Sequence, residues 1–223
     1  MHLPDLKIDT SLSEAVYRAI RKEIASGRLK AGQKITESEI SLAMGISRAP
    51  VREAFKRLAM DHLVNLIPRS GCYVADLDEK EIEEIFEIRK RLECMALEYA
   101  FANFSAHRLR DLRNRFESCK TMASREAVEK EIKLDGYLHD LIAIKSGCDN
   151  LKEMLKALWS RIEIIRLREA ERGYVPVDAA KEHIALLDSL IDGDKDRAVD
   201  LLARHIENSK KTVISHYYCQ KQE

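Results

Sequence analysis

Four residues in the second half of the chain have side chains and spacing suited to metal binding. Asp135 and His139 are four residues apart in a stretch with helical periodicity, so their side chains project from one face. His183 and His205 each lie in an apolar helical stripe and are each 11 residues from Asp194, where a Gly-Asp turn is expected. An antiparallel hairpin folded there would bring the two histidines level. The spacing therefore predicts three imidazoles and one carboxylate in a common core.

These residue types favour a divalent cation over four separate buried polar groups. A lone histidine on an apolar helix face is usually a hydrogen-bonded core residue, but a buried carboxylate is costly without a partner. Neutral imidazoles and one carboxylate are good ligands for zinc, nickel or manganese ions. Three imidazoles and one oxygen would also leave a position open for water or for the carboxylate of a ligand.

Two arginines could bind an anion close to that core. Arg89 interrupts an apolar stripe formed by Ile82, Ile85, Phe86 and Leu92, so its guanidinium should face inward, where it requires an anion. One interpretation is an internal salt bridge to Asp135 or Glu93. The other is a clamp for a carboxylate-bearing effector, with Arg161 and Arg166 as a second, weaker set of candidates.

A second candidate site lies near the amino terminus, in the stretch TESEISLAMGISRAPVREAFKRL. Thr36 and Glu39 have the spacing of a capping box, and a short helix with Ile40 and Ala43 turned inward should follow. Gly45 then permits a sharp turn. Ser47 can cap a second helix whose first turn accommodates Pro50 and whose buried side is Val51, Ala54, Phe55 and Leu58.

Two short helices joined in this way predict a helix-turn-helix that enters the major groove of DNA. Arg48 and Arg52 lie on one face and suit guanine or phosphate, whereas Ser47, Lys56, Arg69 and Gly71 suit phosphates. Arg69 lies in the turn between two β-prone runs, which indicates a wing. The alternative interpretation is a solvated basic face without a ligand.

The elements that must position these sites are mainly helical. With 45% hydrophobic and 34% charged residues, 4 prolines and 8 glycines, the composition indicates a soluble, mostly α protein. We expect a winged helix-turn-helix domain at 1–75, a hinge at 76–78 and an antiparallel helical bundle at 79–223. Bundle helices are expected at 79–102, 106–122, 125–146, 150–171, 178–192 and 195–217.

Charge and cysteine content narrow the function classes. Residues 1–75 carry 12 Lys/Arg against 8 Asp/Glu, whereas the remainder carries 26 against 30, so only the first domain is basic. No apolar run approaches the roughly 20 residues of a transmembrane helix, and no signal core is present. Five scattered cysteines without a C-x-x-C pair favour reduced thiols. We therefore expect a cytoplasmic protein that is not bound to a membrane.

The segment GRLKAGQKITESEISLAMGISRAPVREAFKRLAMDHLVNLIPRSGCYVADL resembles the N-terminal domain of GntR-type bacterial transcription regulators, FadR-like branch. The resemblance implies Arg48 and Arg52 on operator DNA and Gly71 at the wing. The sequence departs from the family pattern at Ala49, where threonine is frequent, and at Ser38, where some members have a DNA-contacting arginine.

The second half is similar to the effector domain called FCD. The similarity rests on D-x-x-x-H at Asp135–His139, the SGCDNL turn and the tail EHIALLDSLIDGDKDRAVDLLARHI. It implies that Asp135, His139, His183 and His205 bind a metal ion and that a small organic acid is the effector.

Three functions remain open from the sequence. The first is a homodimeric, ligand-responsive regulator, a repressor, whose two copies bind a near-palindromic operator. The second is a regulator that senses the metal itself. The third is a metal-dependent enzyme with a DNA-binding head, against which stands the lack of a separate general base or nucleophile on a loop.

Overall fold

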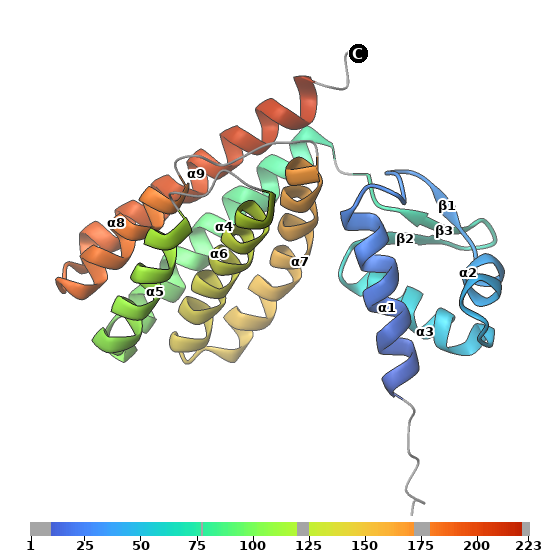
Figure 1. Cartoon of the computed structure of the whole chain (residues 1–223), viewed down its shortest axis with the longest axis horizontal. Coiled ribbons are helices and arrows are strands. Elements are labelled where there is room, and N and C mark those ends of the chain that lie inside the picture. Colours follow the sequence, from blue (N-terminus) through green and yellow to red (C-terminus); the bar gives the residue numbers. More distant parts are fainter. Residues whose placement is uncertain (1–9, 77, 120–124, 172–178, 220–223) are drawn as a thin grey trace, which may run out of the picture. The chain divides into compact units, whose positions relative to one another are not determined.

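The computed structural model describes residues 10–76, 78–119, 125–171 and 179–219. It divides into two compact units, Met1–Asp76 and Leu77–Glu223 (Figure 1). The hinge expected at 76–78 includes Leu77, which lies outside the described residues.

The first unit is a winged helix-turn-helix. Its elements are α1 (Thr10–Ala25), β1 (Lys34–Ile35), α2 (Glu37–Met44), α3 (Arg48–Met60), β2 (Val64–Ile67) and β3 (Gly71–Val74). The strands form one antiparallel sheet in the order β1-β3-β2, with Val64 opposite Val74 and Lys34 opposite Tyr73. β2 and β3 form the expected hairpin, and Arg69 lies in its turn.

Local chemistry explains the helix-turn-helix. The Glu39 N–H donates to Thr36 Oγ1 at 3.2 Å and the Thr36 N–H donates to Glu39 Oε2 at 2.9 Å, which confirms the capping box. Gly45 ends α2 in the left-handed region at φ 65°, where a side chain would be strained. Ser47 occupies the N-cap position of α3, although its side chain makes no capping hydrogen bond.

The core of the first unit lies between α1 and α3. Val51, Ala54, Phe55 and Leu58 of α3 are buried as predicted, against an α1 stripe that includes Val16 and Ile20. The inward placement predicted for Ala43 is wrong. α2 has no buried residue and Ala43 is exposed, because a helix of eight residues contacts α3 along one edge only.

The described part of the second unit contains six α-helices and one short 3₁₀ turn. They are α4 (Glu79–Ala100), the turn η1 (Phe101–Asn103), α5 (Ala106–Cys119), α6 (Arg125–Lys145), α7 (Asp149–Glu171), α8 (Ala179–Ile191) and α9 (Lys195–Cys219). The bounds differ from the predicted ones mainly where α4 tightens into η1. The last residues predicted for the second bundle helix, 120–122, lie outside the described residues.

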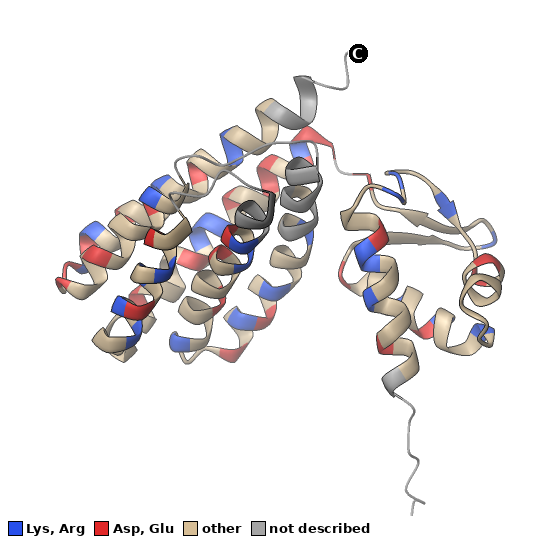
Figure 2. Ribbon diagram, viewed as in Figure 1, with Lys and Arg blue, Asp and Glu red and all other residues tan. Residues whose placement is uncertain are grey.

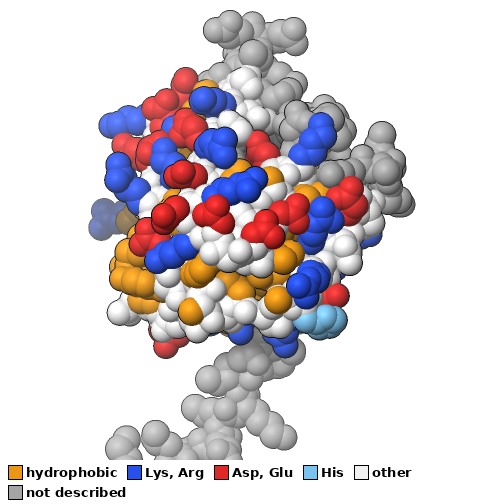
Figure 3. Space-filling view, turned by 90° about the vertical axis from the view of Figure 1, so that its left-hand side faces the viewer, with side chains coloured by type: hydrophobic (Ala, Val, Ile, Leu, Met, Phe, Trp, Pro, Cys, Tyr) orange, Lys and Arg blue, Asp and Glu red, His pale blue; other side chains and the backbone are white. Residues whose placement is uncertain are grey.

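The second unit is a helical bundle, as predicted from its periodicity. α4 packs against α9, α6 and α7, while α5 packs against α8 and α6 (Figure 1). Its apolar core includes Phe86, Phe116, Leu138, Leu155 and Leu202. On the face drawn in Figure 3, basic and acidic side chains are interspersed. Within the described ranges, no helix combines the length and apolar character needed to cross a bilayer.

Candidate metal centre and nucleic-acid interface

The bundle brings the four predicted metal ligands together. Asp135 and His139 come from α6, His183 from α8 and His205 from α9, and one ligand atom of each lies within 4.8 Å of the others. All four side chains are between 0% and 2% exposed. The i/i+4 spacing of Asp135 and His139 and the hairpin around Asp194 thus bring the four side chains together, as the sequence predicted.

The three histidines converge on one carboxylate oxygen. Asp135 Oδ1 lies 2.9 Å from the Nε2 atom of His183, 3.4 Å from that of His205 and 3.6 Å from that of His139. The His183 ring also stacks on Phe116, with centroids 4.5 Å apart, which fixes its orientation.

The other nitrogen of each ring faces a second carboxylate, a feature the sequence did not reveal. His139 Nδ1 is in close contact with Glu93 Oε2 from α4. His205 Nδ1 lies 2.8 Å from Glu182 Oε2 of α8, and His183 Nδ1 lies 3.5 Å from Glu131 Oε1 of α6. Each imidazole is therefore flanked by two acids.

This arrangement determines where the ring protons belong. A nitrogen that donates to a carboxylate carries the proton, which leaves a lone pair on the opposite nitrogen. Burial lowers the pKa of His183 to about 3, so that ring is neutral at physiological pH. The contacts of His139 with Glu93 and of His205 with Glu182 place the proton of those two rings on Nδ1, which leaves lone pairs on Nε2. The Nε2 lone pair of His139 also accepts from Arg89 Nη2, at 3.1 Å.

A divalent cation between the four groups would be coordinated by the carboxylate and the three imidazoles together. A tetrahedral ion with bonds of about 2.05 Å holds neighbouring ligand atoms about 3.3 Å apart. The three nitrogen-to-oxygen distances, 2.9, 3.4 and 3.6 Å, bracket that value. The donor set and these three distances fit such an ion.

Arg89 is buried and forms the internal salt bridge that was one of its two predicted interpretations. Its Nε donates to Glu93 Oε1 at 2.7 Å, and its guanidinium lies 4.1 Å from the Trp159 ring centroid. Although burial opposes it, the charge of Arg89 and the hydrogen bonds from Arg89 and His139 lower the pKa of Glu93 to about 2. Arg161 is separate from this group, because its described ion-pair partner is Glu81, at 3.3 Å.

A pocket of about 300 Å³ between α6 and α7 reaches the metal-binding cluster. Asp135 and Trp159 form part of its wall, as does Leu155. The pocket gives a small molecule a route to the one acidic ligand of the cluster.

The residues predicted to contact DNA are all exposed on the first unit. Ser47, Arg48 and Ala49 lie at the start of α3, with Arg52 and Lys56 further along it. Arg52 forms a two-pronged ion pair with Glu37 of α2, both contacts at 2.8 Å, and Lys56 pairs with Glu53 at 2.9 Å. Figure 2 marks Lys and Arg positions in blue along α1 and in the wing of this unit.

The wing has a backbone that only certain residues tolerate. Arg69 is left-handed at φ 62°. Gly71 has φ 130°, a backbone conformation that strains any side chain, which favours glycine at this position of the wing.

Comparisons with known proteins agree with both units. The FCD domain model matches residues 84–208, and the model described as bacterial regulatory proteins, gntR family, matches residues 12–74. A "Probable D-xylose utilization operon transcriptional repressor" from Paenarthrobacter nicotinovorans is 31% identical over 200 residues, 88% of this chain and 86% of that protein.

Two solved structures are similar in fold. E. coli McbR/YncC superimposes with a TM-score of 0.76 at 24% identity, covering 93% of this chain and 99% of that one. The Zn²⁺-bound FCD domain of the regulator TM0439 has a TM-score of 0.53 at 26% identity, covering 65% of this chain and 99% of that one. The relatives are regulators of transcription, which removes the enzyme hypothesis. The chain belongs to the gntR family of bacterial regulatory proteins and combines the DNA-binding head of that family with an FCD domain.

Proposed function

We propose that this protein is a metal-containing, acid-responsive repressor. Residues 1–75 bind operator DNA, and residues 79–223 hold a divalent cation and a small organic acid. A homodimer places two copies of α3 on the half-sites of a near-palindromic operator. The repressor assignment is supported by the relative from Paenarthrobacter nicotinovorans, which is described as a transcriptional repressor.

The single observation that carries the metal assignment is the orientation of the histidines. Three rings, each with a carboxylate at Nδ1, direct Nε2 toward the same oxygen of Asp135. A cation of the zinc, nickel or manganese type would bind these four groups together, and a relative with an FCD domain is known in a Zn²⁺-bound form. When bound, the ion supplies positive charge for the carboxylate of an effector.

The DNA assignment rests on exposed side chains at the start of α3. Arg48 has no ion-pair partner among the described residues and can approach guanine or phosphate directly. Arg52 must exchange its contact with Glu37 for one with DNA. The sugar-phosphate backbone of the DNA would lie beside Ser47, Ala49, Lys56, Arg69 and Gly71.

The organic acid modulates operator binding by binding one arrangement of the protein better than another. Only such differential affinity can shift the equilibrium between a DNA-binding and a released form. Arg89 holds Glu93 and Trp159 in place beside the cluster, and Arg161 remains a candidate contact for an effector.

The test combines elemental analysis with operator binding. The purified protein should contain one divalent ion per chain and lose it on Asp135→Ala substitution. Binding to a duplex selected from a random library is then measured at fixed salt with the metal-loaded protein, the chelated protein and a panel of carboxylic acids. An acid that binds and lowers DNA affinity supports the proposal. A response to chelator alone identifies the metal as the effector, and no response to either overturns the proposed switch.

A further inference from the structure

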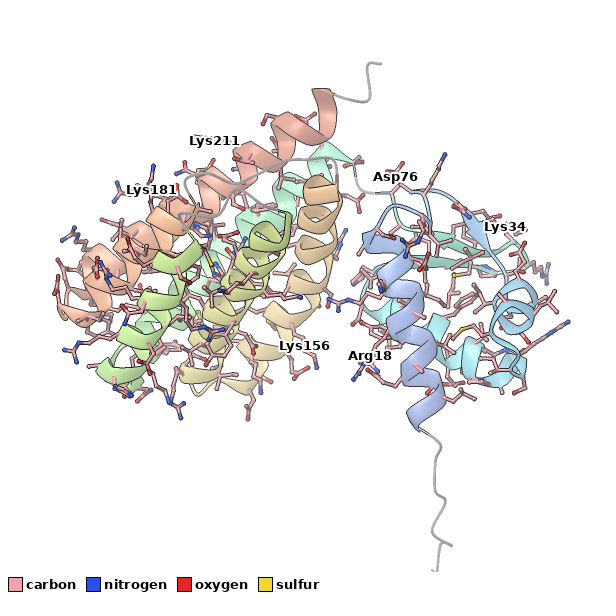
Figure 4. The ribbon with its side chains drawn as sticks, in the orientation of Figure 1. Arg18, Lys34, Asp76, Lys156, Lys181 and Lys211 are labelled. Atoms are coloured by element: carbon pink, nitrogen blue, oxygen red, sulfur yellow. The ribbon has the colours of Figure 1, made fainter. Side chains whose placement is uncertain are left out.

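The pocket between α6 and α7 has a polar floor and a basic mouth. The floor is formed by Asp135 and Trp159, and the mouth carries Lys133 from α6 with Lys152 and Lys156 from α7 (Figure 4 labels Lys156). Asp140 and Ser160 also line it. Apart from the metal ligand Asp135, the charged lining of the pocket therefore consists of three lysines and one acidic residue, Asp140.

The floor contains a hydrogen-bond donor that lacks an acceptor. Trp159 Nε1 is buried and makes no hydrogen bond to any described residue. The indole cannot turn away easily, because its ring lies 4.1 Å from the guanidinium of Arg89 and 4.7 Å from the His139 ring. An unsatisfied buried N–H is costly, so the floor is complementary to a ligand that supplies an oxygen atom.

The mouth contains charges that repel one another. Lys152 and Lys156 are four residues apart on α7, a spacing at which like charges destabilise a helix. In the described part of the chain, no ion-pair partner is found for Lys133, Lys152 or Lys156. An anion between them would remove the repulsion.

We propose that the effector carries two acidic groups, one bound at the floor beside Asp135 and Trp159 and the other bound at the mouth by Lys152 and Lys156. The first contact rests on the proposed function, whereas the second depends on the lysines alone. The second group is a carboxylate or a phosphate, since both match a lysine ammonium.

Helix geometry sets the distance between the two groups. With a rise of 1.5 Å per residue, Lys156 and Lys152 lie about 4.5 Å and 10.5 Å from Trp159 along the helix axis. The volume of about 300 Å³ is at the small end of ligand pockets. An acid with four to six carbons, counting those of its two acidic end groups, fits both the axial distances and the pocket volume.

The test compares acids of equal chain length with one or two acidic groups. Calorimetric titrations of the metal-loaded full chain would use succinate against butyrate and adipate against hexanoate, at constant ionic strength because salt screens the lysines. Phosphoglycolate represents the phosphate alternative. The variants are Lys152→Gln/Lys156→Gln and, as a matched control, Lys211→Gln, an exposed lysine of α9 (Figure 4).

The wild type should bind the better two-acid ligand at least about tenfold more tightly than its one-acid counterpart. The double lysine variant should lose most of that preference while its affinity for butyrate or hexanoate stays within about twofold, and Lys211→Gln should change neither. Equal affinity for both kinds of acid, or a preference that survives in the double variant, overturns the two-group proposal while the acid-responsive function stands. If no acid binds the metal-loaded protein, both fail.

Discussion

The two units place their charged residues in opposite ways. In the first unit the arginines and lysines of α3 are exposed, and the core between α1 and α3 is apolar. In the helical unit, Arg89, Glu93, Asp135 and three histidines are at most 2% exposed. Exposed charges such as those of α3 change the stability of the fold little, and they remain available to bind a polyanion such as DNA. Buried charges must neutralise each other or bind an ion.

In the first unit, ligand binding and fold stability therefore depend on different residues, whereas in the helical unit they depend on the same residues. Removing an exposed arginine of α3 should change DNA affinity without changing stability. Removing a member of the buried cluster should change stability, metal affinity or both, because each group is the counter-charge of another.

The largest effect is expected for Arg89→Met. It leaves Glu93 buried without its guanidinium and should destabilise the helical unit by about 3–5 kcal/mol. The measurement is urea unfolding followed by circular dichroism, which reports on both units because both contain helices. The matched control is Arg52→Met, which breaks the exposed pair with Glu37 and should leave the unfolding midpoint unchanged. Equal effects of the two substitutions would remove the contrast between the units.

The second largest effect concerns the metal. A saturating divalent ion at one hundred times its dissociation constant should stabilise the wild type by about 2.7 kcal/mol, measured as a thermal shift. Asp135→Asn should abolish that shift. In the presence of chelator, however, the variant should be at least as stable as the wild type, because an amide N–H can donate to a histidine lone pair. A variant that still gains stability from the metal would contradict the ligand assignment.

How far the sequence predicted this site depends on where each contact originates. Asp135 and His139 are neighbours on one helix, and His183 and His205 are related by a turn between consecutive helices, so spacing alone located them. Glu93 comes from α4 and meets His139 of α6, a contact that depends on packing between distant segments. Spacing along a helix cannot reveal it.

The same reason explains the other residues that the sequence did not identify. Glu131 and Glu182 resemble ordinary surface acids until the bundle brings His183 and His205 against them. Trp159 resembles a core aromatic residue. In the first unit, local signals such as the capping box at Thr36 were sufficient for the helix-turn-helix, but they did not reveal that Ala43 stays exposed.

A third prediction tests the exposed face of α3. Arg48→Ala should weaken operator binding by about 1–3 kcal/mol and relax specificity at one base pair if the guanidinium contacts guanine. If it contacts phosphate instead, affinity falls for all sequences and the salt dependence decreases by about one ion. In either case the thermal midpoint should match that of the wild type. A loss of stability would show that the exposed charges of this unit also support its fold.

The smallest effect contrasts a surface charge cluster with the buried one inside the helical unit. Hydrogen bonds from Lys210 and Lys90 lower the pKa of Glu87 to about 2 from 4.5. Its folded pKa is depressed, so its contribution to stability is complete above pH 4.5 and disappears as the pH falls toward 2. Because Glu87 is 41% exposed, Glu87→Gln should cost less than about 1 kcal/mol at pH 7. The difference in unfolding free energy between variant and wild type should narrow below pH 4.5 and at high salt. If the difference changes with neither pH nor salt concentration, Glu87 contributes packing between α4 and α9 and not charge.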